Sequence, residues 1–364
     1  MRSRNIAYIP ELDHLRLLAA LIVFAFHYFH FYVGGWKPFN HVPWLGLITE
    51  GHTGVTLFFV LSGFIFMRIA IEGGDITYGQ FLKNRLLRIL PLFLTIFVVA
   101  ISIGRDKFQA TDLLYLFVTN LGGAPTSWHF TTGPAWSISV EFWFYLVFPF
   151  LALFYRVDGA RYLYKLIVLL WFVKLAAFLA NDNSTHMLYS TVIGRFDQFL
   201  IGMLAADIYS QRRHWFHANG RLLLALAIAL VFAGVTAQAR WFSLYADNKH
   251  EPIWVIWGSI EAALWGFVVV GYVSANIVWP SWMETALRKG GEASFSFYMW
   301  HALIIYTAYE LIGLVGGATY VALALNGLFL LIATILFSWL SYSTIERPFL
   351  SMRARYTSAS DRQH

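Results

Sequence analysis

Residues 12–33 have the sequence LDHLRLLAALIVFAFHYFHFYV, an apolar stretch long enough to cross a lipid bilayer. A transmembrane helix needs about 20 mostly apolar residues, and this stretch carries only two formal charges, Asp13 and Arg16. It does not resemble a cleaved signal peptide, because both charges lie inside the helical pattern and no small-residue cleavage site follows. We therefore expect a helix of the mature protein.

Nine further apolar runs of similar length follow along the chain. They lie near residues 53–71, 88–104, 134–154, 165–181, 191–209, 221–238, 253–277, 294–313 and 319–344. This pattern predicts an all-α integral membrane protein of about ten transmembrane helices, organised as one membrane domain over residues 1–364. The composition agrees, because 59% of residues are hydrophobic and 13% are charged, against about 25% charged in soluble domains.

Basic residues set the expected orientation. With the N-terminus placed in the cytoplasm, 17 Lys and Arg residues fall in the inside segments and five in the outside ones. Short cytoplasmic loops are enriched in Lys and Arg, so both termini are predicted to be cytoplasmic. The net charge of +6 is distributed over these loops, which favours membrane orientation over nucleic-acid binding. The absence of Cys excludes thiolate nucleophiles, Cys zinc sites and iron–sulfur clusters.

Several charged residues lie inside the predicted spans. They are Arg16, Arg68, Lys174, Arg195, Glu141, Glu261 and Glu310. A charge at membrane depth costs several kcal/mol and turns toward the protein interior, where it is paired or functional. Arg68 and Glu310 lie near span ends, so we expect structural roles for both.

Arg16 and His27 share one face of the first predicted helix. Eleven residues at about 100° each bring them within about 20° of three full turns, and about 16 Å apart along the axis. An arginine and a deeper imidazole on one stripe suit a ligand with an anionic end and a reactive end. The alternative is that His27 is a core histidine bonded to a neighbouring carbonyl.

Seven motifs in order along the chain resemble signatures of the membrane acyltransferase-3 family. They are LDHLRLLAALIVFAFH (12–27), GVTLFFVLSGFI (54–65), FLKNRLLRILP (81–91), PAWSISVEFWFYLVFP (134–149), GRFDQFLIGM (194–203), SFSFYMWHALI (294–304) and YSTIERPF (342–349). In the first motif, His14 and the Leu pair after Arg16 depart from the family pattern but leave Arg16 and His27 in place.

The resemblance implies O-acyl transfer from a cytoplasmic acyl-CoA, commonly acetyl-CoA, to a hydroxyl of an extracytoplasmic carbohydrate. Acceptors in this family include O-antigens of lipopolysaccharide and exopolysaccharide units, in free or polyprenyl-linked form, and the resemblance implies a location in a bacterial inner membrane. The rival class is a polytopic transporter that uses the intramembrane charges for substrate or proton passage. It predicts inverted repeats, which the sequence does not show.

The catalytic pair is predicted to be His27 and Glu141. His27 is the expected general base, or alternatively a covalent acyl carrier. Glu141 is expected to orient the imidazole or act as a second base, unless it is paired only with Arg195. Both His27 and Glu141 lie seven residues, about 10 Å, beneath the same predicted membrane face, so we expect them to share a cavity.

Donor and acceptor contacts are predicted at opposite membrane faces. Arg16 and the cytoplasmic cluster of Lys83, Arg85 and Arg88 are expected to hold the CoA phosphates, unless the cluster serves only orientation. The donor channel is expected to include Tyr298, Trp300 and His301. The acceptor is expected to contact the exterior loop near 105–133, with Trp128, Arg195 and Asp197. No metal site is predicted, because the histidines lack the carboxylate spacing of one.

Overall fold

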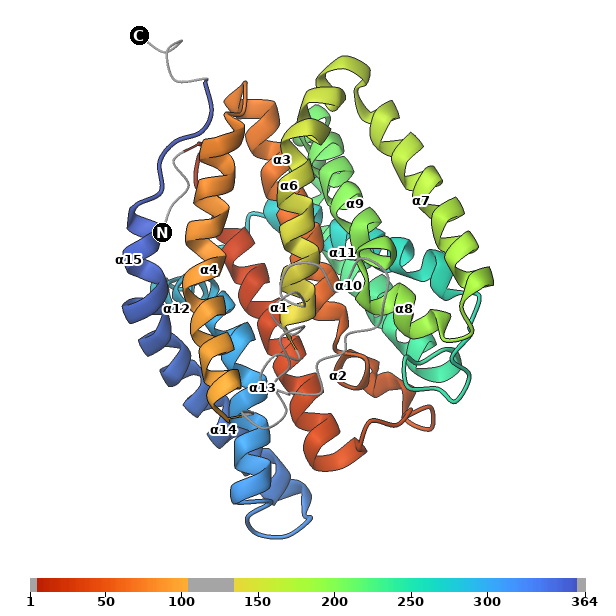
Figure 1. The fold of residues 1–364 in the computed structure, drawn as a ribbon, viewed down its shortest axis with the longest axis vertical. Coiled ribbons are helices and arrows are strands. Elements are labelled where there is room, and N and C mark those ends of the chain that lie inside the picture. Colours follow the sequence, from red (N-terminus) through yellow and green to blue (C-terminus); the bar gives the residue numbers. More distant parts are fainter. Residues whose placement is uncertain (1–4, 104–133, 359–364) are drawn as a thin grey trace.

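The computed structural model describes residues 5–103 and 134–358, where the regular elements are helical, as predicted (Figure 1). The long helices are α1 (Pro10–Phe29), α3 (Thr53–Gly73), α4 (Tyr78–Ile103), α6 (Ala135–Asp158), α7 (Ala160–Ala180), α9 (Val192–Gln211), α10 (Arg213–Trp241), α11 (Trp254–Ser274), α13 (Ser294–Leu311) and α14 (Tyr320–Ser341). The shorter helices are α2 (Gly46–Thr49), α8 (Ser184–Ser190), α12 (Ser281–Glu292) and α15 (Arg347–Ser351). A short 3-10 turn, η2 (Pro43–Leu45), precedes α2, and the π-helical turns η1 (His30–Gly34) and η5 (Tyr342–Glu346) extend α1 and α14.

Each of the ten predicted apolar runs falls on one of the long helices. Within the described ranges, seven helices are long and apolar enough to cross a membrane. The other three long helices, α4, α9 and α13, do not meet this condition of length and apolar composition. Buried polar residues such as Asp197 in α9 and His301 in α13 lower the hydropathy of their helices. The chain is thus a multi-pass helical protein, and the number ten stays a prediction.

The two described ends of the chain meet at one face of the bundle. The Tyr356 backbone N–H donates to Asn5 Oδ1 at 3.0 Å, and Ile76 and Thr357 form an isolated backbone bridge. Ends that lie on one side of a membrane require an even number of crossings. This agrees with the predicted topology, while the assignment of that side to the cytoplasm stays a prediction.

Helix α3 lies at the centre, packed against α1, α9 and α11 (Figure 1). A Cβ atom on Gly63 would lie 2.1 Å from the Phe199 carbonyl oxygen, and one on Gly202 would lie 2.3 Å from that of Val60. Only glycine permits this backbone approach between α3 and α9. Both glycines belong to the motifs at 54–65 and 194–203, so those motifs encode helix packing.

Helix α12 was not predicted, because it is short and amphipathic. It lies in a segment that the hydropathy pattern assigns to a cytoplasmic loop. It packs so closely on α1 that a Cβ atom on Gly291 would lie 2.1 Å from the Asp13 carbonyl oxygen. This contact fixes the end of α1 that carries Arg16.

Candidate active site

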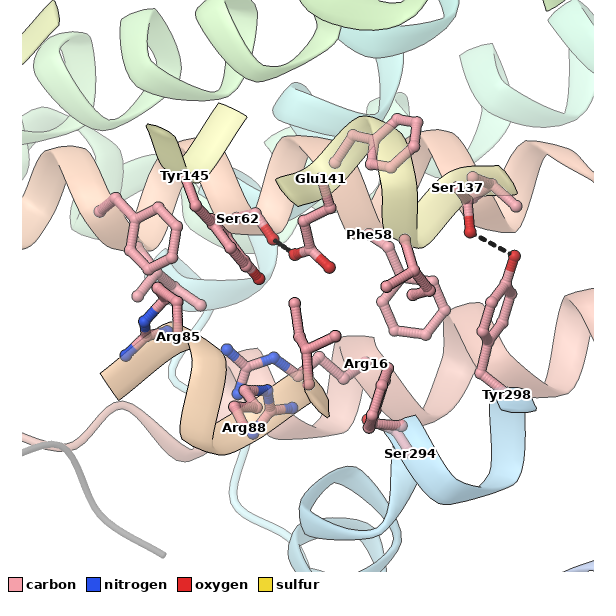
Figure 2. Close-up of a pocket in the computed structure, with 17 residues that line it drawn as sticks. Arg16, Phe58, Ser62, Arg85, Arg88, Ser137, Glu141, Tyr145, Ser294 and Tyr298 are labelled. Atoms are coloured by element: carbon pink, nitrogen blue, oxygen red, sulfur yellow. Dashed lines mark hydrogen bonds between the residues drawn. The ribbon is translucent and has the colours of Figure 1, made fainter. Parts of the chain in front are cut away.

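A pocket with a cavity volume of about 60 Å³ lies between α1, α3, α4, α6 and α13 (Figure 2). A volume of this size holds only a few water molecules, which is too little for a nucleotide. Its polar lining consists of Arg16, Ser62, Arg85, Arg88, Ser137, Glu141, Tyr145, Ser294 and Tyr298. The fold therefore gathers five residues that the sequence analysis proposed for the site: Arg16, Arg85, Arg88, Glu141 and Tyr298.

Three guanidinium groups lie together on one side of this pocket (Figure 2). Arg16 Nη1 donates to Asp13 Oδ1 at 2.7 Å. The Arg85 guanidinium lies 4.9 Å from the centroid of the Phe66 ring, and its buried Nε has no hydrogen-bond partner in the described part of the chain. Leaving a buried charged donor without an acceptor is costly. This end of the pocket is therefore suited to an anion such as a phosphate.

Arg353, in the segment after α15, adds a fourth positive charge. Burial lowers the pKa of the Arg353 guanidinium below its ordinary value, and the positive charges of Arg85, Arg88 and Arg16 lower this pKa further. We call these four residues the arginine cluster. No sequence pattern indicates this position of Arg353, because its approach to the other three arginines depends on tertiary structure. A bound polyanion would offset the repulsion among these charges.

Lys83 does not belong to the arginine cluster. Its exposed side chain lines a separate groove, together with Leu86 and Phe349. Two residues along a helix correspond to about 200°, so Lys83 and Arg85 point to opposite sides of α4. The prediction that grouped Lys83 with Arg85 around the donor is not supported by this placement.

Glu141 extends into the middle of the pocket (Figure 2). Ser62 Oγ donates a hydrogen bond to its Oε1 atom at 2.6 Å. Arg195, the alternative partner, instead lies with Nη1 at 3.5 Å from Glu261 Oε2 and donates to Thr56 Oγ1 at 3.1 Å. The alternative that Glu141 only neutralises Arg195 is therefore not supported.

Arg195 and Asp197, which were predicted to contact the acceptor, are buried inside the bundle. Lys174 Nζ donates to Asp197 Oδ2 at 2.7 Å, and Ser259 donates to the same oxygen. These ion pairs connect α9 to α7 and α11, as expected of charges within a membrane protein interior. Trp128, the third residue predicted at the acceptor, lies outside the described residues.

His27, in the last turn of α1, contacts His301 of α13. The Nδ1 atom of His27 lies 2.9 Å from the Val23 carbonyl oxygen and 3.2 Å from His301 Nε2. The Nδ1 atom of His301 lies 2.5 Å from the Tyr298 carbonyl oxygen. Because carbonyl oxygens only accept, both Nδ1 atoms carry the proton when the rings are neutral. Nε2 of His27 then holds the free lone pair that a base or nucleophile requires.

This arrangement changes the expected partner of His27. His301, which was expected in the donor channel, contacts the imidazole of His27. Glu141, the expected partner of His27, instead accepts a hydrogen bond from Ser62. The shared cavity of His27 and Glu141 stays a prediction. Tyr298 links the two parts, because its hydroxyl lines the pocket and lies 2.7 Å from Ser137 Oγ, while its carbonyl binds His301.

Trp300 does not line the pocket. Its Nε1 donates to Ser341 Oγ at 2.9 Å, and its ring packs against Phe337 of α14. The predicted contact of Trp300 with the donor is therefore not supported. Across the described ranges, no group of three or more His, Cys, Asp or Glu residues could hold a metal ion.

Comparison with known proteins supports the motif-based resemblance. A family model described as an acyltransferase domain matches residues 9–343. The chain is 23% identical over 334 residues to the peptidoglycan O-acetyltransferase OatA of Listeria monocytogenes, covering 82% of this chain and 49% of that protein. It is 24% identical over 333 residues to the O-acetyltransferase OatA of Staphylococcus aureus, covering 82% of this chain and 51% of that one.

The chain spans about half the length of these curated relatives. No solved structure matches it. The family match extends over nearly the whole sequence and includes all the long helices. The chain therefore belongs to the membrane acyltransferase-3 family.

Proposed function

We propose that this chain is an O-acyltransferase of the bacterial inner membrane, forming a single membrane domain. In this proposal it moves an acetyl group from acyl-CoA to a hydroxyl of a cell-surface or lipid-linked carbohydrate. The main support is the arrangement along α1, where Arg16 joins the arginine cluster and His27 keeps a free Nε2 lone pair. The names of the bacterial relatives support the acetyl group and the bacterial membrane.

The arginine cluster supports acyl-CoA as the donor. The nucleotide end of CoA carries several phosphate charges, and arginine forks match phosphate oxygens bidentately. A cavity of about 60 Å³ is too small for a nucleotide, so the nucleotide lies at the end of the cavity that the arginines line, beside Arg85, Arg88 and Arg353. The pantetheine arm then leads past Glu141 toward Tyr298.

His27 supplies the proton chemistry. Its Nε2 atom removes the proton of the acceptor hydroxyl while the hydroxyl oxygen attacks the thioester carbonyl carbon. The carbon–sulfur bond then breaks, and the imidazolium returns the proton to the departing thiolate. The same lone pair serves an acyl-histidine route, in which Nε2 displaces the thiolate before the hydroxyl attacks. In both routes, Nε2 of His301 accepts a hydrogen bond from the Nδ1–H group of His27. This contact keeps the reactive lone pair at Nε2 of His27.

The transporter alternative is less favoured. The family model that matches the chain describes an acyltransferase. The intramembrane charges of α9 are also fixed in pairs, Lys174 with Asp197 and Arg195 with Glu261. Paired charges of this kind hold helices together without forming a pathway.

A transfer assay tests the proposal. Purified protein in lipid vesicles is incubated with acetyl-CoA labelled in the acetyl group and with free and polyprenyl-linked glycans. We expect a base-labile ester on one class of glycan, formed by the wild-type chain and not by His27→Ala. Passage of label across the vesicle membrane without ester formation would instead support the transporter.

A further inference from the structure

Trp36 lies over the end of α1, beside His27. The chain reverses after η1 at Gly35, whose φ of 51° favours glycine. The ring centroids of Trp36 and His27 are 6.0 Å apart. One face of Trp36 stacks on His30, with centroids 5.2 Å apart and an angle of 7° between the planes. The turn thus places a large aromatic ring next to the histidine that carries the free lone pair.

Two more aromatic rings extend this surface. Tyr245, between α10 and α11, lies with its ring centroid 5.8 Å from that of Trp36 and 4.9 Å from that of His30. Phe31, in η1, lies 5.3 Å from Trp36. We call Trp36, Phe31 and Tyr245 the aromatic platform. Its members come from two distant parts of the sequence, so only the folded chain brings them together.

The platform rests on buried residues, and Trp36 is its exposed member, whereas Phe31 and Tyr245 are partly buried. Trp36 is 44% exposed, whereas Phe26 and His30 beneath it are 2% and 1% exposed. A tryptophan that is fixed on one face and open elsewhere is a rigid surface, which lowers the entropic cost of binding a ligand. Apolar groups that are contiguous and open to the surface are typical of binding sites, and Trp36 is in ring contact with its two partly exposed neighbours.

We propose that the aromatic platform is the acceptor subsite and that its ligand is a pyranose ring of the glycan. This inference rests on the proposed function for the identity of the acceptor. A pyranose ring has a face of C–H groups that packs on an aromatic ring, while its hydroxyls project from the rim. A sugar seated against Trp36 presents a rim hydroxyl to the neighbouring His27.

A role as a membrane anchor explains Trp36 less well. Interfacial tryptophans hold a protein at the membrane surface and need no fixed ring partners. Trp44 fits that description, because it is 60% exposed and has no ring contact in the part of the chain that the structure describes. Trp36 instead contacts Phe26, His27, His30 and Phe31.

Saturation-transfer NMR on the protein in lipid nanodiscs tests this subsite without any acyl transfer. The probes are tetramers of β-1,4-linked N-acetylglucosamine, of glucose and of mannose. We expect the wild type to bind at least one tetramer, and Trp36→Ala to weaken that binding by about tenfold, the scale of one aromatic contact. Trp36→Phe should retain part of the affinity, and the control Trp44→Ala should bind like the wild type. Tyr245→Leu, in which Trp36 is unchanged, should also weaken binding.

Acetyl-CoA affinity, measured on the same samples, reports whether each variant remains folded. The subsite is wrong if no tetramer binds the wild type, or if folded Trp36→Ala and Tyr245→Leu both bind like the wild type. Sugar binding without acetyl transfer would contradict the proposed function and leave the subsite standing. Acetyl transfer by Trp36→Ala with an unchanged KM for the acceptor would contradict the subsite and leave the proposed function standing.

Discussion

The two ends of helix α1 differ in charge and in the way their side chains are held. At the Arg16 end, the arginine cluster combines like charges from α1, α4 and the segment after α15, and Arg85 Nε is left without a partner. At the His27 end, the imidazole is held by the Val23 carbonyl and by His301, beneath Trp36. About 16 Å of helix separates Arg16 from His27.

This difference indicates that the two ends recognise different chemistry. Guanidinium groups that repel one another are stabilised by a polyanion, whereas aromatic and imidazole rings with fixed contacts favour a sugar and proton transfer. One helix thus fixes the distance between donor and acceptor sites. Variants at one end should therefore change one substrate's binding and leave the other unchanged.

The largest effect is expected for His27→Ala. Removal of the general base should lower the turnover number by at least about 100-fold, the lower range for such a group. Acetyl-CoA affinity should be preserved, because the arginine cluster is intact. His41→Ala, at an exposed histidine outside the pair with His301, is the control. Near-normal turnover in His27→Ala would move the chemistry away from this end of α1.

The next largest effect is expected for Arg85→Ala and Arg88→Ala. Each should weaken acetyl-CoA binding by about tenfold to a hundredfold, because hydrogen bonds to charged groups contribute about 1.5–3 kcal/mol. Calorimetry should show this loss while saccharide affinity is unchanged. Lys83→Ala is the matched control on the opposite side of α4 and should bind acetyl-CoA like the wild type. Equal losses in all three variants would mean that the basic residues act only through overall charge.

A smaller effect on turnover is expected for His301→Ala. The Nδ1 proton of His27 would keep the Val23 carbonyl as its acceptor, so we expect a loss of about tenfold in kcat, smaller than the loss of about 100-fold or more expected when the general base itself is removed. KM values for both substrates should be unchanged, and the pH–rate profile should shift because His27 loses its neighbouring ring. An unchanged profile with a changed donor KM would return His301 to the donor channel.

The smallest effect is expected for Arg353→Ala. Its side chain is partly exposed, and exposed charges contribute about 1 kcal/mol or less. Acetyl-CoA affinity should therefore fall by no more than about fivefold. The loss should shrink further at high salt, which screens exposed charges. A loss larger than that of Arg85→Ala would place the main phosphate contact outside the cavity.

The sequence predicted the helices well, because each span is specified locally by its length and apolar composition. It missed α12, whose amphipathic pattern is too short for hydropathy. Arg85 and Arg88, which were predicted together at the donor site, line one pocket. The placement of Lys83 and Trp300 does not support their predicted contacts with the donor, because sequence proximity does not tell which face of a helix turns inward.

Contacts between distant segments were the part that the sequence could not supply. His301 was a candidate only as a member of its motif, and its contact with His27 depends on how α13 packs against α1. Arg353 follows the last helix and carries no pattern that ties it to α4. Trp36 and Tyr245 were not singled out, because many Trp and Tyr residues in a membrane protein are interfacial.

Cysteine labelling tests most directly whether the two ends of α1 serve different substrates. The chain contains no native cysteine, so Ala354→Cys beside the arginine cluster and Lys37→Cys beside the platform each introduce a single thiol at an exposed position. We predict that a membrane-impermeant maleimide labels these thiols from opposite sides of a sealed vesicle, and that acetyl-CoA protects only the thiol at position 354. Labelling of both thiols from one side, or protection of the thiol at position 37 by acetyl-CoA, would contradict the account.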